Sequence, residues 1–392
     1  MPALDYSVLE LGCGNGANLL PLAHYRPHAR FVGVDGSRRA IEMAEARRRE
    51  LDLRNLSFIH ADFVSAADHV GGRFDFILMH GVFSWVSPRT RAELLELCAA
   101  RLAPAGLLYL NYNAKPGWNI RGMVRDFLLA QTARATGLGA RANLAREVAA
   151  SVAASLEGLE HPYSQLMQRE CRFVCESHPS YVAHEFLTEH NHAFWRSEFL
   201  DIAGRYGFQY VADADFNYES GRIPDGIAEQ IAASGLDRSS LEDTIDLLSY
   251  RQLHSPILSK AGLMARSPES HELAELFVAS PLVRTSEQQP WPRFRHPSGY
   301  EVDAREQPIC QALDVLSSLW PRGARLASLF EPVDPWLEDI LLLHRHGLLE
   351  LRVVEPDLAT AATALRSCEE RWGGYVTTPY HTYEIIRADA DE

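Results

Sequence analysis

Near its start the chain reads VLELGCGNG at residues 8–16, an apolar run around one acid followed by a glycine at every second position. The apolar run predicts a buried β-strand, and the glycines predict a tight turn that leads into a helix. Without Cβ atoms, Gly12, Gly14 and Gly16 can adopt positive φ and let a ligand lie directly against the backbone. A strand, a glycine-rich turn and a helix in this order are typical of folds that bind a nucleotide-like ligand.

Short apolar stretches alternate with helical patterns through the first part of the chain. After the opening strand, further strands are expected at residues 31–35, 56–60, 74–79, 107–111, 208–212 and 253–259. The helical pattern before residue 102 begins with Ser87 and Pro88, which suit an N-cap and the first helical position. This alternation predicts an α/β fold, with a mostly parallel sheet covered by helices on both faces.

Acidic residues lie at or near the ends of three of these strands. Glu10 precedes the glycine turn, Asp35 ends the second strand, and Asp62 follows the third. Ligands of open parallel sheets bind at the carboxyl ends of the strands, where an acid after the second strand can accept the hydroxyls of a ribose. We expect Asp62 to accept the exocyclic amine of an adenine, with Phe63 packed beside the ring.

Two cofactors compete for this site. The spacing Gly12-x-Gly14-x-x-Ala17 satisfies a loose dinucleotide fingerprint. The acid before the turn and the alternating glycines instead resemble motif I of class I methyltransferases, which bind S-adenosylmethionine, and no later stretch offers an evident hydride-transfer site. We therefore favour S-adenosylmethionine. The residues expected to bind it are Glu10, Gly12, Gly14, Gly16, Asn18, Asp35, Gly36, Ser37, Asp62, Phe63, His80 and Gly81.

Charge and cysteine content disfavour several classes of protein. The chain has 52 acidic and 38 basic residues, so we expect no nucleic-acid partner, which would require a basic surface. No apolar run reaches the roughly 18 residues that span a bilayer, and no secretory signal is recognisable, so we expect a cytoplasmic protein. Cys171 and Cys175 have His178 and His184 nearby but no second cysteine pair, and we expect no metal site.

The rest of the chain suggests three further segments. We predict a methyltransferase-like core over residues 1–262, interrupted at 114–195 by a mostly helical insert above the carboxyl edge of the sheet. The proline-containing stretch 263–300 is predicted to be a linker. Residues 301–392 read as helices followed by strands, which predicts a winged-helix-like α+β domain. Its helix at 336–346 has few basic residues, which favours an interaction role, with homodimerisation as one possibility.

Motifs outside the glycine turn resemble one bacterial family. HGVFSW at 80–85, YNAKPGW at 112–118, HEFL at 184–187 and FRHPSG at 294–299 are similar to motifs of class I methyltransferases that carry a methyltransferase regulatory domain. That family includes bacterial protein-lysine methyltransferases that act on outer-membrane proteins. The resemblance implies an S-adenosylmethionine-dependent enzyme that N-methylates lysine side chains of a protein or peptide.

The chain departs from this family at two points. Family members carry a few dozen residues before the first strand, which help to cover the cofactor, whereas here the strand begins within the first ten residues. We expect either a trimmed segment or a cover from elsewhere. The basic run that precedes the family's last core strand is thinned here to YRQLHS at 250–255, which suggests a different substrate if that run contacts it.

Lysine methylation requires a neutral amine in line with the transferable methyl group. The free amine is protonated at pH 7, and its deprotonation costs about 4.6 kcal/mol, so a proton acceptor is expected nearby. The catalytic candidates are His80, Tyr112, His184 and Glu185. The candidates for a substrate channel, where rings can hold an alkylammonium by cation–π contact, are Trp85, Tyr112, Trp118 and His190.

Structural alternatives exist for all of these side chains: core packing for the aromatic ones, and a hydrogen-bond network for the ionisable ones. Two other functions also stay open at this point. One is a methyltransferase that tailors a ribosomal natural-product peptide or a small metabolite. The other is a non-catalytic scaffold that binds S-adenosylmethionine.

Overall fold

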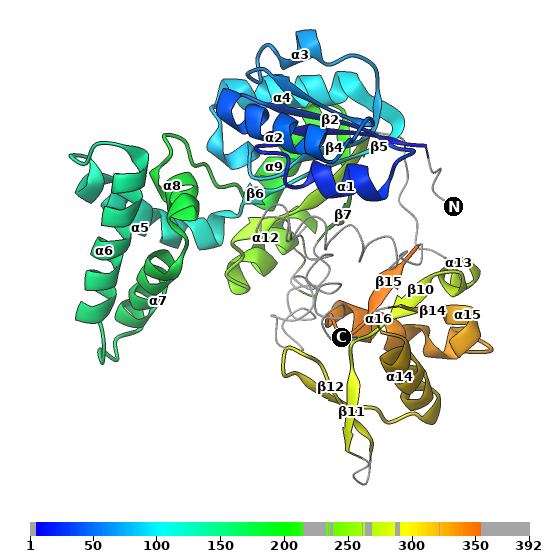
Figure 1. Cartoon of the computed structure of the whole chain (residues 1–392). Coiled ribbons are helices and arrows are strands. Elements are labelled where there is room, and N and C mark those ends of the chain that lie inside the picture. Colours follow the sequence, from blue (N-terminus) through cyan, green and yellow to red (C-terminus); the bar gives the residue numbers. More distant parts are fainter. Residues whose placement is uncertain are drawn as a thin grey trace.

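The computed structural model describes residues 5–214, 238–260, 269–286, 291–320 and 322–353, together with the single residues 233, 235 and 262. The described chain contains a sheet with helices on its faces, a group of four helices that projects from it, and a C-terminal α+β module (Figure 1). A helix that the sequence suggests at 225–233 lies almost wholly outside the described residues.

The first part is one seven-stranded sheet in the order β3-β2-β1-β4-β5-β9-β7. Its strands are β1 (Ser7–Leu11), β2 (Arg30–Asp35), β3 (Leu56–His60), β4 (Phe74–Met79), β5 (Leu102–Leu110), β7 (Phe208–Asp213) and β9 (Pro256–Lys260). The strands β1 to β5 are parallel, and β9 is antiparallel to both of its neighbours. The predicted Rossmann-like α/β sheet is thus confirmed, and its strand order reverses at β1, where ligands of such folds bind.

Helices on both faces bury the central strands. They are α1 (Leu19–Tyr25), α2 (Arg38–Glu50), α3 (Ala66–His69), α4 (Pro88–Arg101), α9 (Arg196–Arg205) and α12 (Arg238–Leu248). Leu9, Leu11 and Ile77 are fully buried, as expected for a parallel sheet covered on both sides. The Ser37 side chain caps α2 by accepting the Ala40 N–H, and the Ser87 side chain caps α4 in the same way.

The insert consists of four helices: α5 (Lys115–Thr132), α6 (Leu138–Ser155), α7 (Pro162–Glu176) and α8 (Pro179–Leu187). The buried face of α6 is lined by alanines at helical spacing, which lets its neighbours pack closely. Both ends of the insert are fixed to the core. At its start, the Gly117 N–H donates to the Arg251 carbonyl at 2.8 Å, and at its end the Phe194 N–H donates to the Asn113 carbonyl at 2.9 Å.

A short two-stranded sheet, β6 (Tyr112–Asn113) with β8 (Leu253–His254), lies at the root of the insert. The strand β6 follows β5, and β8 directly precedes β9. The small sheet therefore joins the end of the parallel core to its last antiparallel strands.

The C-terminal module has an apolar core of its own. Its strands are β10 (Phe277–Ala279), β11 (Val283–Ser286), β12 (Arg293–Arg295), β13 (Glu301–Asp303), β14 (Ala324–Arg325) and β15 (Glu350–Arg352). Its helical segments are α13 (Ser270–Ala274), α14 (Gln307–Leu319), α15 (Leu326–Leu329), η2 (Asp334–Trp336) and α16 (Leu337–Arg345). The order α14, β14, α15, α16, β15 is compatible with a winged helix, but residues 354–392 are not described, and that identity stays a prediction.

The predicted linker at 263–300 requires correction. The strands β10, β11 and β12 all lie in this range, and β10 is the central strand between β14 and β15. Val278, Leu282 and Phe294 are fully buried in the same apolar core as Leu316 of α14. The described prolines Pro281, Pro292 and Pro297 stand between successive strands, so the module begins well before residue 301.

None of the helices in the described part of the chain combines the length and the apolar character needed to cross a membrane.

Candidate functional site

The three glycines of the turn after β1 all adopt left-handed backbone conformations, with φ of +81° at Gly12, +53° at Gly14 and +78° at Gly16. A Cβ at Gly12 would lie 2.4 Å from Val82, and one at Gly16 would lie 2.6 Å from Phe58. A Cβ at Gly14 would meet nothing within 4 Å. The outer glycines are therefore required by packing, and the middle one leaves open space against the backbone.

Asp35 connects this turn to the end of β2. Its Oδ2 accepts the Gly14 N–H at 2.8 Å, and its Oδ1 accepts the Ser37 N–H at 2.7 Å. Gly36 lies between them, close to the chain at Asp62 on the next strand end. The structure thus brings the predicted residues of the first two strand ends together, with the half-buried Asp35 carboxylate between them.

Glu10 is buried beneath the turn, with only 4% of its surface exposed. Its Oε1 accepts a hydrogen bond from Asn18 Nδ2 at 3.0 Å, and its Oε2 has no hydrogen-bond partner among the described residues. Burial raises the pKa of Glu10 to about 7, the Asn18 hydrogen bond lowers it, and the charge of Asp35 raises it. A buried carboxylate oxygen without a partner, beside an open turn, suits a positively charged ligand group.

Asp62 lies at the end of β3 and is fully exposed. Its Oδ1 accepts both the Ser65 N–H at 2.7 Å and the Ser65 hydroxyl at 2.8 Å, and these bonds lower its pKa. Asp62 therefore helps to start α3, which is a structural role rather than a cofactor-binding one. It nevertheless lies at the carboxyl edge of the sheet, where cofactor-binding residues are predicted. Phe63 is half-buried, and its ring lies 3.7 Å from the position of a Cβ on Gly12, while its predicted contact with an adenine stays a prediction.

The end of β4 meets helix α8 of the insert. Gly81 has φ of +68°, and a Cβ there would lie 3.9 Å from the Nε2 of His184. The His184 ring stacks on the Trp85 indole, with centroids 5.1 Å apart and planes at 29°. The Trp85 Nε1 is buried and has no hydrogen-bond partner among the described residues. His184 and Trp85 are thus neighbours although they are about a hundred residues apart in the chain, and their catalytic and channel roles stay predictions.

Two imidazoles face the same region. Partial desolvation lowers the pKa of His80, and the charge of His184 lowers it further. Partial desolvation also lowers the pKa of His184, against a smaller raising effect of the Gly81 backbone. Both rings are therefore neutral near pH 7 and able to accept a proton.

Tyr112 and Trp118 do not line an open site. Tyr112 is 1% exposed and stacks on Phe199 of α9, with ring centroids 4.2 Å apart. Trp118 is 5% exposed and packs against Phe186 within the insert. The prediction that these two aromatic residues contact substrate is corrected: both are core residues, because the faces on which they lie are covered by helices.

Glu185 follows His184 in α8, but its side chain is buried, and His190 lies beyond the end of the helix. Glu185 is 9% exposed, and burial raises its pKa to about 8 while Arg121 of α5 lowers it. It is therefore buried toward the interior of the insert. His190 lies beyond the end of α8, where its carbonyl accepts the Thr188 hydroxyl at 3.0 Å.

Several buried polar residues lie near the site that are not among its candidate residues. Asn111 is 3% exposed and its Oδ1 accepts the Gly81 N–H at 2.7 Å. Asn113 and Ser84 are also buried, and the Asn113 N–H donates to the Ser84 hydroxyl at 2.8 Å. The sequence does contain a hint of these residues, since Asn111 and Asn113 follow an apolar strand. A buried amide there requires hydrogen-bond partners.

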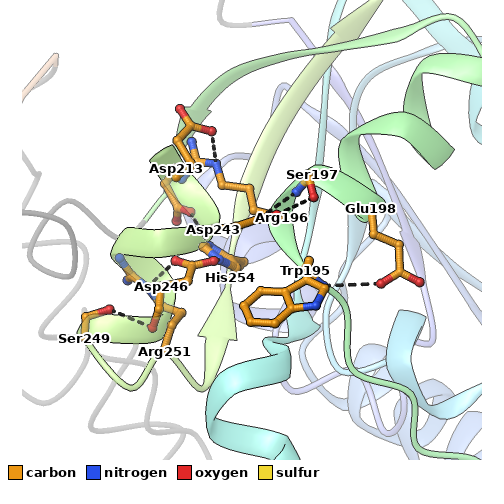
Figure 2. Close-up of polar contacts among 11 residues, drawn as sticks. Trp195, Arg196, Ser197, Glu198, Asp213, Asp243, Asp246, Ser249, Arg251 and His254 are labelled. Carbon is orange, nitrogen blue, oxygen red and sulfur yellow. Dashed lines mark hydrogen bonds and ion pairs between the residues drawn. The ribbon is translucent and has the colours of Figure 1, made fainter. Parts of the chain in front are cut away.

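A second buried polar cluster lies at the root of the insert (Figure 2). His254 is 2% exposed; its Nε2 lies 2.6 Å from Asp246 Oδ2 and its Nδ1 lies 3.5 Å from Asp213 Oδ2. Burial lowers the pKa of His254, but the two aspartates outweigh this effect and raise it. Arg251 pairs with Asp246 at 3.4 Å, so the basic residue of the thinned run YRQLHS is internal.

Residues 8–106 match the model of a methyltransferase domain, and residues 178–259 match that of a predicted methyltransferase regulatory domain. One uncharacterized protein of Rickettsia prowazekii is 33% identical over 252 residues, which are 64% of this chain and 45% of that protein. Another from the same organism is 29% identical over 210 residues, 54% of this chain and 84% of that protein.

The structure of PKMT2 from Rickettsia typhi in complex with AdoHcy has a similar fold. It superposes with a TM-score of 0.78 at 24% identity, over 91% of this chain and 73% of that chain. The chain therefore has the class I methyltransferase fold, and its matched domain is one that uses S-adenosylmethionine. It spans less than half the length of the first curated relative.

Proposed function

We propose that this class I methyltransferase transfers the methyl group of S-adenosylmethionine to lysine side chains of a protein or peptide. The observation that carries the proposal is the stacking of His184 on Trp85 next to Gly81 at the end of β4, where the charge of His184 also acts on His80. The motifs that resemble those of bacterial protein-lysine methyltransferases support the substrate class, and the fold shared with PKMT2, whose structure is known in complex with AdoHcy, supports the cofactor.

The residues around the turn suit this cofactor. S-adenosylmethionine carries a sulfonium and an ammonium group, and the partnerless Oε2 of Glu10 would favour such positive charge. Gly14 leaves open space against the backbone, and Asp35, which accepts the Gly14 N–H, would accept the ribose hydroxyls. When bound, the cofactor supplies an electrophilic methyl group and a good leaving group.

The protein's own task is then to present a neutral amine. The imidazole of His184 or His80 would accept the proton of the incoming lysine ammonium, because both rings are neutral near pH 7. The Trp85 indole would hold the alkylammonium before deprotonation through cation–π contact. Alignment of amine and methyl group supplies much of the remaining rate enhancement.

Labelled S-adenosylmethionine and a cell lysate test the proposal. The expected result is label on lysine side chains, identified by mass spectrometry, and its loss in Gly14→Asp. Label only on small molecules would indicate a metabolite-tailoring enzyme. Cofactor binding without any transfer would indicate a scaffold. A cytoplasmic location, homodimerisation and the absence of a nucleic-acid partner remain predictions.

A further inference from the structure

Helix α8 is joined to the core by a bridge of two side-chain amides. Asn113 of β6 is 1% exposed, and its Nδ2 donates to Asn191 Oδ1 at 3.1 Å. The Nδ2 of Asn191 in turn donates to the Glu185 carbonyl at 3.1 Å. That carbonyl belongs to the last turn of α8, where carbonyl groups have no partner within the helix.

Ser84 fixes the other side of the same contact. Its hydroxyl accepts the Asn113 N–H at 2.8 Å, and its carbonyl accepts the His192 N–H at 2.8 Å. Ser84 is adjacent to Trp85, as Glu185 is to His184. The bridge therefore connects the immediate neighbours of the two stacked rings and sets how they lie relative to each other.

We propose that Asn191 is a positioning residue that holds the end of α8 so that His184 stays stacked on Trp85 beside Gly81. This role rests on the proposed function only where it concerns methyl transfer. In Asn191→Leu, the buried Asn113 amide and the Glu185 carbonyl both lose their partner, which favours displacement of the helix end. In Asn191→Asp, the acceptor for Asn113 is kept and only the donor to Glu185 is lost.

Trp85 fluorescence tests the positioning without any substrate, because a protonated imidazole stacked on an indole quenches it. The signal of Trp85 is taken as the difference between the full chain and its Trp85→Phe variant, followed from pH 8 to pH 5. We expect quenching with a midpoint below that of a free histidine, and its loss in His184→Gln. Asn191→Leu should lose most of the quenching, and Asn191→Asp part of it.

The matched control is Asn143→Leu, the same change at an exposed position of α6. It should leave the titration unchanged. An Asn191→Leu protein that keeps the wild-type titration would overturn the proposal. So would an equal loss in the Asn143→Leu control, because the effect would then be general.

Kinetics add a second readout once an acceptor is known. Asn191→Leu should lower kcat on the order of 10–100-fold, because misplacement of a group by about 1 Å has effects of this size. The Kd of S-adenosylhomocysteine should change less than about threefold, because the glycine turn is untouched. Equal losses in kcat and cofactor binding would contradict positioning. If the wild type methylates no lysine, the proposed function fails, and the fluorescence result still decides the role of Asn191.

Discussion

At residue 10 the chain buries a carboxylate and gives only one of its oxygens a hydrogen bond. Such a group destabilises the ligand-free protein when it is ionised, and it becomes favourable when a cation binds next to it. The folded state holds the Glu10 proton more tightly than the unfolded chain, because its pKa is raised from 4.5 to about 7. The stability of the ligand-free protein should therefore fall as the pH rises from about 4.5 to 7.

Glu10→Gln tests whether the Glu10 charge lowers the stability of the ligand-free protein while it strengthens cofactor binding. Glutamine can still accept the Asn18 hydrogen bond, and it carries no charge. At pH 8 we expect the ligand-free variant to be more stable than the wild type, on the order of 2–3 kcal/mol, with little difference at pH 4.5. Calorimetric titration should show S-adenosylmethionine binding weakened about 10–100-fold. A variant that is less stable at pH 8 and binds normally would refute this role of Glu10.

At Tyr112 we expect substitutions to affect stability rather than activity. Because its ring is packed on Phe199 in the core, Tyr112→Phe should leave the rate of methyl transfer within about twofold of the wild type. Tyr112→Ala should instead lower the stability by about 3–5 kcal/mol through the cavity it leaves. Thermal unfolding and the transfer assay measure both effects. A large loss of activity in a fully stable Tyr112→Phe protein would restore the residue as a catalytic candidate.

At the scale of elements, the insert depends on a buried ion pair between its helices. Arg121 of α5 lies 3.0 Å from Glu170 of α7, and both side chains are less than 10% exposed. The Tyr250 hydroxyl also donates to Glu170, at 3.0 Å, so the pair connects the insert to the chain that follows α12. Removal of one partner leaves a buried charge, which costs more than removal of both.

Arg121→Met should therefore destabilise the insert by about 3–5 kcal/mol. The double variant Arg121→Met/Glu170→Leu should recover much of this loss. Hydrogen exchange of peptides from residues 115–187 measures both, with peptides from β1 and β4 as the internal control. If the single and the double variants are equally destabilised, the charge of Glu170 is not the cause.

At the scale of the whole molecule, His254 links α12, β7 and β8 through Asp246 and Asp213. Carboxylate oxygens only accept hydrogen bonds, so both ring nitrogens must donate, which makes the ring an imidazolium. The aspartates raise its pKa above that of the unfolded chain. Its contribution to stability is thus complete below about pH 6.5 and is lost as the pH rises through the folded-state pKa.

We therefore expect the protection of residues 238–260 against hydrogen exchange to decrease at alkaline pH, after correction for the intrinsic rate. His254→Gln can donate to only one aspartate, so it should be less protected than the wild type at pH 6. The difference should become smaller toward pH 9. A difference that grows with pH would show that the ring is neutral in the folded protein.

The sequence by itself determined the sheet and its cofactor edge, because both depend on local signals. Apolar runs set the strands, the positive φ values of the turn require glycine at 12, 14 and 16, and the strand ends place Asp35 beside them. Parallel strands bring their carboxyl ends to one edge whatever the loops contain. The prolines of residues 263–300, by contrast, are a local signal that predicts a linker, although part of this stretch folds into strands.

Only the tertiary structure decided which of the predicted catalytic and channel residues lie in contact with one another. Tyr112 and His80 both lie at the ends of core strands, and only the packing of α9 shows that Tyr112 is enclosed. His184 reaches Gly81 from about a hundred residues away because Asn113 and Asn191 hold α8 in place. No local pattern predicts such a contact, since it results from the path of the insert back to the sheet rather than from periodicity.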